Sequence, residues 1–165
     1  MDSGETAVSG DDAVFAALYP GLRRWAAVCG PSEVDPDDLV QEAVARTLRS
    51  HALSDLEDPA AYLRRAIVNL AANHRRGMAR WRGAVARLSR AADVEATTPS
   101  YASDLADLLR LAPEARAVLW LVEVEDCTYA AAGAVLGITE EAARTRAARA
   151  RQQLRLHLLK EEKEQ

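Results

Sequence analysis

The sequence predicts an all-α protein made of two small helical domains joined by a flexible linker. Alanine is abundant and aromatic residues form only 5% of the 165 residues, a composition that favours helices. Leucine, isoleucine and valine recur at helical spacing along most of the chain. In the segment 91–103, Thr, Pro and Ser cluster without apolar periodicity, so we interpret it as a linker between domains at 12–90 and 104–159.

The first domain is expected to contain three helices. The first spans about residues 12–29, where apolar side chains recur every three or four positions. A second helix is expected at 36–50, because Asp35 supplies an N-cap and a proline follows it at the first helical position. After a loop at 51–58, the same Asp-Pro pair precedes a third helix at 59–91.

The second domain carries a predicted helix-turn-helix. Helices at about 104–111 and 113–126 precede it, and the second of these starts with a proline. A short alanine-rich helix then runs to Leu136, and Gly137 stops it because glycine reaches left-handed backbone angles without steric cost. Thr139 caps the next helix, which carries several arginines and few acids, as a helix that enters the major groove of DNA requires.

Charge is strongly segregated along the chain, although the net charge is only −4. Residues 33–58 contain eight acids and two arginines, whereas residues 62–90 contain eight arginines and no acid. The basic bias returns at 144–155. Such segregation predicts separate sites for partners of opposite charge, including nucleic acid.

Other features exclude several classes of protein. Residues 1–11 are acidic and polar, so we expect a disordered leader and not a signal peptide, and residues 160–165 are expected to form a solvated tail. No apolar run is long enough to cross a bilayer, so we expect a cytoplasmic protein. Cys29 and Cys127 are expected to be reduced thiols. No catalytic, metal-binding or cofactor-binding motif appears, so an enzyme is not expected.

Three blocks follow one another in a fixed order: DLVQEAVARTLR at 38–49, DPAAYLRRAIVNLAANHRR at 58–76, and the stretch from Leu109 to Arg155. Together they resemble bacterial RNA polymerase sigma factors of the extracytoplasmic-function type, in the sigma-70 superfamily. The resemblance implies that the domain at 12–90 binds core polymerase and recognises and melts the minus-ten element. It implies that the domain at 104–159 reads the minus-thirty-five element.

The resemblance also implies partners and contact residues. The partners are core RNA polymerase, through the clamp helices of its largest subunit and its flap, promoter DNA, and an anti-sigma factor or other regulator, without membrane insertion. The residues implied for core polymerase are Asp38, Leu39, Gln41, Glu42, Arg46 and Arg49. Those for the minus-ten element are Tyr62, Arg65, Asn69, Asn73, His74, Arg75, Arg76 and Arg80. Those for the minus-thirty-five element are Thr139, Glu140, Arg144, Thr145, Arg146, Arg149 and Arg151.

Some features leave alternatives open. The family usually has larger side chains at Ala131, Ala132, Ala143 and Ala147, and this departure predicts a lightly packed second domain. For Trp81 we favour a role in helix packing over stacking on a base. Two other functions remain alternatives: an autonomous helix-turn-helix transcriptional regulator, and a sigma-like helical adaptor without promoter activity.

Overall fold

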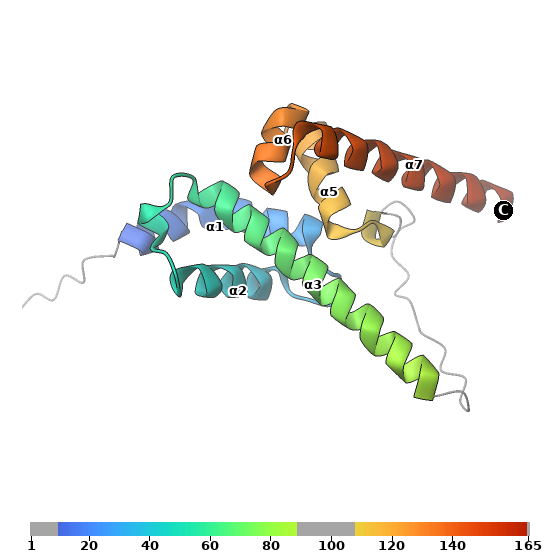
Figure 1. Ribbon diagram of the computed structural model, residues 1–165, viewed down its shortest axis with the longest axis horizontal. Coiled ribbons are helices and arrows are strands. Elements are labelled where there is room, and N and C mark those ends of the chain that lie inside the picture. The colour runs from blue at the N-terminus through green and yellow to red at the C-terminus, as the bar shows by residue number, and fades with distance from the viewer. Residues whose placement is uncertain (1–9, 89–107, 165) are drawn as a thin grey trace, which may run out of the picture.

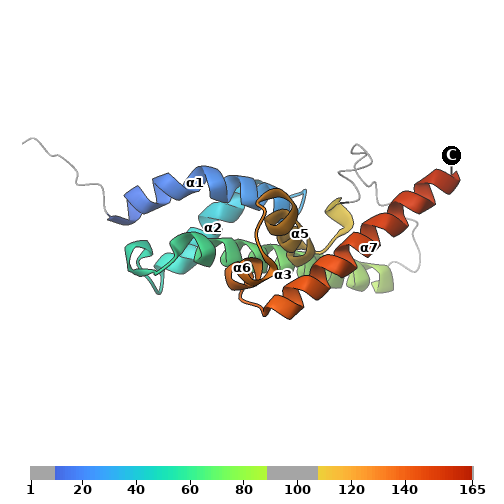
Figure 2. The same ribbon diagram turned by 90° about the horizontal axis from the view of Figure 1, so that it is seen from above.

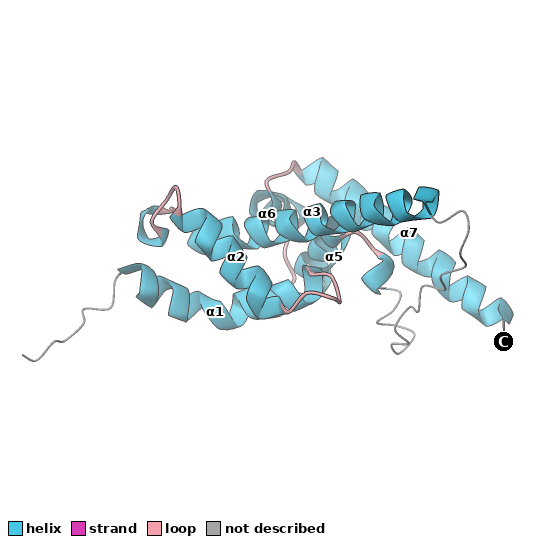
Figure 3. Ribbon diagram, turned by 90° about the horizontal axis from the view of Figure 1, so that it is seen from below, coloured by secondary structure: helices cyan, strands magenta, loops and turns pink. Residues whose placement is uncertain are grey.

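The computed structural model describes residues 10–88 and 108–164 (Figure 1). Every regular element in these two ranges is a helix, which confirms the all-α prediction (Figure 3). The predicted linker at 91–103 lies outside the described residues. So does most of the predicted leader, whose last two residues, Gly10 and Asp11, instead begin the first helix.

The first domain is a three-helix unit. It comprises α1 (Gly10–Cys29), α2 (Pro36–Leu48) and α3 (Pro59–Leu88), with a short 3-10 turn, η1 (Leu53–Asp55), before α3. The predicted Asp-Pro starts of α2 and α3 are confirmed, because the Asp35 carboxylate accepts a hydrogen bond from the backbone of Asp37 at 2.8 Å and Asp58 caps α3 in the same way. The second half of α3 projects beyond α1 and α2 (Figure 1).

The second domain differs from the prediction in two places. Its named helices are α5 (Pro113–Leu119), α6 (Tyr129–Leu136) and α7 (Glu140–Glu164). The predicted single helix at 113–126 is α-helical only as far as Leu119 and then continues as a π-helical turn, η2 (Trp120–Val124). The Glu125 amide bonds to the Trp120 carbonyl, and Asp126 takes a φ of 52°, which ends the helix. The segment 160–165, predicted to be a solvated tail, is instead helical as far as residue 164, because α7 continues into it. Lysine and glutamate in this segment favour helix.

The helix-turn-helix is confirmed residue by residue. Thr128 caps α6 by accepting from the Ala131 amide at 3.1 Å, and Gly137 ends α6 with a φ of 69°. Thr139 caps α7 by accepting from the Ala142 amide at 3.1 Å. Gly133 allows the turn to close, since a Cβ there would lie 2.7 Å from the Ile138 carbonyl oxygen.

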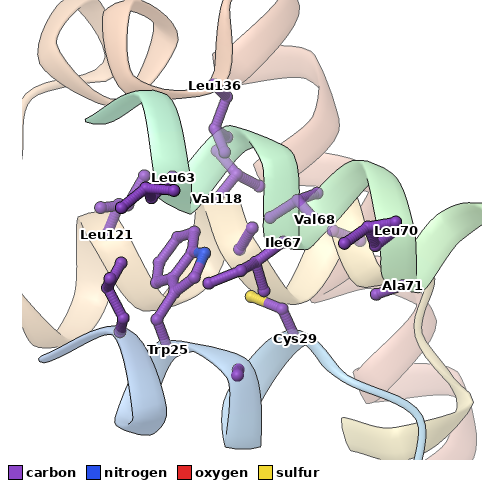
Figure 4. Close-up of a cluster of buried hydrophobic side chains, with 14 of the residues drawn as sticks. Trp25, Cys29, Leu63, Ile67, Val68, Leu70, Ala71, Val118, Leu121 and Leu136 are labelled. Atoms are coloured by element: carbon purple, nitrogen blue, oxygen red, sulfur yellow. The ribbon is translucent and has the colours of Figure 1, made fainter. Parts of the chain in front are cut away.

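The two domains share one hydrophobic core (Figure 4). Trp25 of α1 and Ile67 of α3 belong to the first domain, and Val118, Leu121 and Leu136 of the second domain join the same buried cluster. The light packing predicted from the alanines is not supported at Ala132, Ala143 and Ala147, which are completely buried, whereas Ala131 is exposed. Small side chains therefore line a closed contact between α6 and α7.

Candidate functional site

The outer face of α2 is polar and exposed. Five of the six residues predicted to contact polymerase lie on it or at its C-cap with exposed side chains: Asp38, Gln41, Glu42, Arg46 and Arg49. The prediction was wrong for the sixth residue, Leu39. Its side chain is only 4% exposed and packs in the core. Leu39 belongs to the apolar inner face of α2, which is an amphipathic helix.

A small network holds α2 against α1. The Tyr19 hydroxyl donates to Asp37 Oδ1 at 2.6 Å, and Arg23 Nε donates to the same oxygen at 2.9 Å. The hydrogen bond to the Asp37 carboxylate raises the pKa of Tyr19, so the phenol remains a donor at neutral pH. The network fixes the direction in which α2 presents its outer face.

One side of α3 presents polar side chains to solvent. Asn69, Asn73 and Arg80 are exposed at helical spacing, and Tyr62 continues this stripe to the start of the helix. The ring of Tyr62 lies 5.6 Å from that of His51 in a tilted arrangement. His74 is half-buried. This stripe, Tyr62–Asn69–Asn73–Arg80, is the part of the predicted minus-ten surface that remains open to a large ligand.

The other predicted minus-ten residues contact the second domain instead. Arg65 donates from Nη2 to the Ala134 carbonyl at 2.9 Å and from Nε to the Val135 carbonyl at 3.3 Å. Arg75 donates to the Arg110 carbonyl at 3.2 Å. Arg76 lies 4.0 Å from the Glu114 carboxylate and also donates to Asn73 at 2.6 Å. The structure therefore divides the predicted set into an open stripe and a group that also contacts the second domain, although Arg75 and Arg76 of that group remain exposed.

Trp81 is not a packing residue in the described part of the chain. Its side chain is 61% exposed on the projecting half of α3, between the exposed Arg80 and Arg82. The favoured prediction of helix packing was therefore wrong.

The arginines of α7 also fall into two groups. Thr139, Thr145, Arg146 and Arg149 line an open groove of about 510 Å³ along the helix, and neither arginine has a hydrogen-bond or ion-pair partner among the described residues. Glu141 also lines this groove, but it forms no ion pair with either guanidinium group, so both remain available to an anionic ligand.

The second group is held by acids and by Tyr129. Arg144 pairs with Glu140 at 2.7 Å and lies over the Tyr129 ring at 5.4 Å. Arg151 pairs with Glu123 and donates to the Tyr129 hydroxyl at 3.0 Å. Hydrogen bonds to Glu123 and Tyr129 raise the pKa of Arg151. Glu140, predicted to contact the minus-thirty-five element, is therefore already paired with Arg144.

The sequence prediction missed Arg116. This side chain is only 6% exposed and donates to the carbonyls of Cys29 and Gly30 at 3.1 and 3.0 Å. The available signal was its position within PEARAVLWLV, where an arginine follows an alanine inside an otherwise apolar helix. That pattern could indicate burial, but it does not reveal a partner 86 residues away.

Two kinds of site are not found in the part of the chain that the structure describes. No three His, Cys, Asp or Glu side chains gather there to hold a metal ion. No helix of that part is both long and apolar enough to cross a membrane.

Comparisons with known proteins agree with the division into two domains. Residues 14–82 match the family model Sigma-70 region 2, and residues 108–154 match Sigma-70, region 4. The fold is similar to that of the sigma factor RpoE from Bartonella quintana in its complex with the anti-sigma factor NepR, with a TM-score of 0.58 and 20% identity. The similarity covers 88% of this chain and 94% of that one. Among curated proteins, no sequence matches the chain significantly.

Proposed function

Because the chain belongs to the sigma-70 family, with the two regions of the extracytoplasmic-function type, we propose that it binds core RNA polymerase and directs promoter-specific transcription initiation. The observation that carries the proposal is the presence on one chain of three open polar surfaces in the two matched regions. These surfaces are the outer face of α2, the stripe on α3 and the groove of α7. The protein supplies recognition, and the polymerase performs the chemistry.

The outer face of α2 is proposed to bind the clamp helices of the largest polymerase subunit. Asp38, Gln41 and Glu42 offer acceptors on one exposed face, and Arg46 and Arg49 offer donors at its end. In the second domain, we propose a contact with the polymerase flap.

The stripe on α3 is proposed to hold the opened minus-ten strand. Single-stranded DNA binding requires cations for the backbone and flat or amide-bearing side chains for unstacked bases. Arg80 supplies the cation, Asn69 and Asn73 supply amides, and Tyr62 supplies an exposed ring.

The groove of α7 is proposed to read the minus-thirty-five duplex. Thr145 and Arg149 are one helical turn apart and exposed, so both can reach base edges in the major groove. Arg146 is better placed for a phosphate, because it is half-buried at the side of the same groove.

An anti-sigma factor or other regulator is proposed as a further partner. The support is the fold similarity to RpoE, a sigma factor solved in complex with the anti-sigma factor NepR. Regulation by a protein that covers DNA-binding or polymerase-binding surfaces would fit a chain whose function depends on several open surfaces.

Polymerase binding is tested by gel filtration of the purified chain with core polymerase. We expect co-elution of the unaltered protein and its loss in the double variant Asp38→Arg with Gln41→Arg, which makes the α2 face more positive by three charges. The matched control is Ser32→Arg with Glu57→Arg, which makes the same change of charge at exposed positions outside α2. Equal binding by both double variants would show that α2 is not the polymerase contact.

A further inference from the structure

The projecting half of α3 carries a tryptophan that the core does not use. Figure 1 and Figure 2 both show this half of the helix extending past the ends of α1 and α2. Trp81 lies there and is 61% exposed, the highest fraction among the large apolar residues that the structure describes. Leu70, three turns earlier on the same face of α3, is buried in the core. The core therefore ends before this face of the helix reaches Trp81.

The other two tryptophans have partners that Trp81 lacks. Trp25 is buried, and its Nε1 atom donates to the Arg64 carbonyl at 3.0 Å. Trp120 is half-buried, and its Nε1 atom donates to the Glu125 carboxylate at 3.0 Å. Trp81 has no hydrogen bond, ring contact or cation over its ring among the residues that the structure describes. Its indole is open to a ligand, and contact with a flat apolar group would remove apolar surface from water.

The surroundings of Trp81 are basic. Arg80 and Arg82 flank it, both are exposed, and neither forms an ion pair within the described ranges. Arg82 Nε donates to the Met78 carbonyl at 3.4 Å, which engages only one of the N–H donors of that guanidinium. The whole segment 62–90 contains eight arginines and no acid. An exposed ring between free cations suits a nucleic acid, because each nucleotide offers a flat base and a phosphate together.

The position of Trp81 continues the stripe on α3 that is proposed to hold the minus-ten strand. Trp81 follows Arg80, the last residue of the stripe, and is turned from it by about 100° around the helix. It lies about 12 Å beyond Asn73, at about 1.5 Å of rise per residue. Stacked nucleotides are about 3.4 Å apart along a strand, so a strand that contacts Asn73 reaches Trp81 after about three or four further nucleotides.

We propose that Trp81 is a stacking platform for one unpaired base of single-stranded DNA, with Arg80 and Arg82 holding the phosphates on either side of that base. The inference rests on the proposed function of α3 in holding the opened minus-ten strand, and it extends that site to residues that the sequence resemblance does not imply. Every base has an aromatic face, so stacking on an indole tolerates any base. The platform adds affinity for the opened strand without adding a base preference.

The test measures binding of the full chain to oligothymidylate of about 12 nucleotides, a single strand that forms no duplex. Fluorescence anisotropy of the labelled oligonucleotide gives the affinity. Trp81→Ala removes the ring, and Trp81→Phe keeps an aromatic face. The matched control is Leu156→Ala, which truncates an apolar side chain of similar exposure, 52%, on α7. Circular dichroism verifies that each variant keeps its helix content.

We expect Trp81→Ala to bind about tenfold more weakly than the unaltered chain, because the stacking contact is lost. Trp81→Phe should retain most of the affinity, within about threefold, and Leu156→Ala should bind as the unaltered chain does. Tryptophan emission gives a second readout, since Trp81 is the most exposed of the three indoles. Unlabelled oligothymidylate should quench the emission of the unaltered chain and leave that of Trp81→Phe unquenched at saturation.

Unchanged affinity in folded Trp81→Ala would overturn the proposal, and the exposed ring would then be open to a protein partner instead. Absence of binding or of quenching in the unaltered chain would overturn it as well. Failure of the proposed function is distinguishable, because it would appear as a holoenzyme of the unaltered chain without promoter-specific transcripts. The oligothymidylate measurements need neither polymerase nor promoter, so they test the platform separately.

Discussion

Arginine residues of similar appearance in the sequence have different roles in the structure. Arg149 faces an open groove without a partner in the described ranges, whereas Arg151, two positions later, is held by Glu123 and Tyr129. The sequence places both on one basic helix but cannot separate them, because the partners of Arg151 lie 22 and 28 residues away. Side-chain direction and partner, and not residue type, decide which arginine is available to DNA.

A substitution pair tests this distinction at the proposed minus-thirty-five surface. We expect Arg149→Ala to cost about 1–3 kcal/mol of discrimination at one base pair, because a forked contact with a base edge is lost. We expect Arg151→Ala to leave base preference unchanged and to lower the free energy of unfolding by less than about 1 kcal/mol, because its ion pair is exposed. The measurement is holoenzyme binding to a series of minus-thirty-five variants. A loss of preference at one base pair with Arg151→Ala would contradict the assignment.

The two cysteines should differ in reactivity. Burial raises the pKa of the Cys29 thiol to about 12, so at pH 8 it is protonated and shielded, whereas Cys127 is only half-buried. We expect a thiol reagent at pH 8 to label Cys127 rapidly in the native chain and Cys29 only after denaturation. Mass spectrometry of the labelled peptides gives the two rates. Equal rates in the native protein would show that the end of α1 is not buried.

The elements show which parts of a helical fold are encoded locally. The starts of α2 and α3, the stop at Gly137 and the cap at Thr139 follow from neighbouring residues, and all were predictable. The π-helical turn was not, because Glu125 leaves the helical pattern to reach Arg64 and Trp120. The polymerase contact predicted for Leu39 was wrong for a different reason, since a resemblance to a contact helix does not say which of its residues face the core.

Two glycines, Gly137 in the turn after α6 and Gly83 inside α3, should respond in opposite directions to alanine. Gly137→Ala places a side chain at a φ of 69° and against Arg65, so we expect the free energy of unfolding to fall by about 1–2 kcal/mol. Gly83→Ala lies inside α3 with no atom within 4 Å of the added Cβ, so we expect a gain of about 0.5–1 kcal/mol. Urea denaturation measures both values. A stabilising Gly137→Ala would mean that the turn does not require left-handed geometry.

At the scale of the whole molecule, two regions that match separate family models are joined by one core and a rim of arginines. The sequence predicted the two regions and their order, but not their contact, because the hydrogen-bond partners of Arg64, Arg65 and Arg116 across that contact lie 61 to 87 residues away. Arg64 and Arg76 of the basic segment pair with Glu125 and Glu114 of the second domain, which lie outside the acidic segment 33–58.

Opening of promoter DNA should depend on the exposed stripe of α3. We expect Asn69→Ala with Arg80→Ala to leave the holoenzyme assembled, because both residues are exposed on α3 and neither belongs to the proposed polymerase-binding face of α2. We expect the double variant to reduce the number of permanganate-reactive thymines near the start site. The matched control is Arg24→Ala, an exposed arginine of α1 without a partner in the described ranges. Unchanged reactivity in the double variant would mean that the stripe is only a solvated face.

In the proposed function, this chain gives core RNA polymerase its choice of promoter. The most direct measurement is to add the purified chain to core polymerase with genomic DNA and sequence the 5′ ends of the transcripts. We predict new start sites that share two upstream sequence elements and disappear with the Asp38→Arg and Gln41→Arg variant. Transcript ends identical to those of core polymerase alone, with a chain shown to be folded, would contradict the claim.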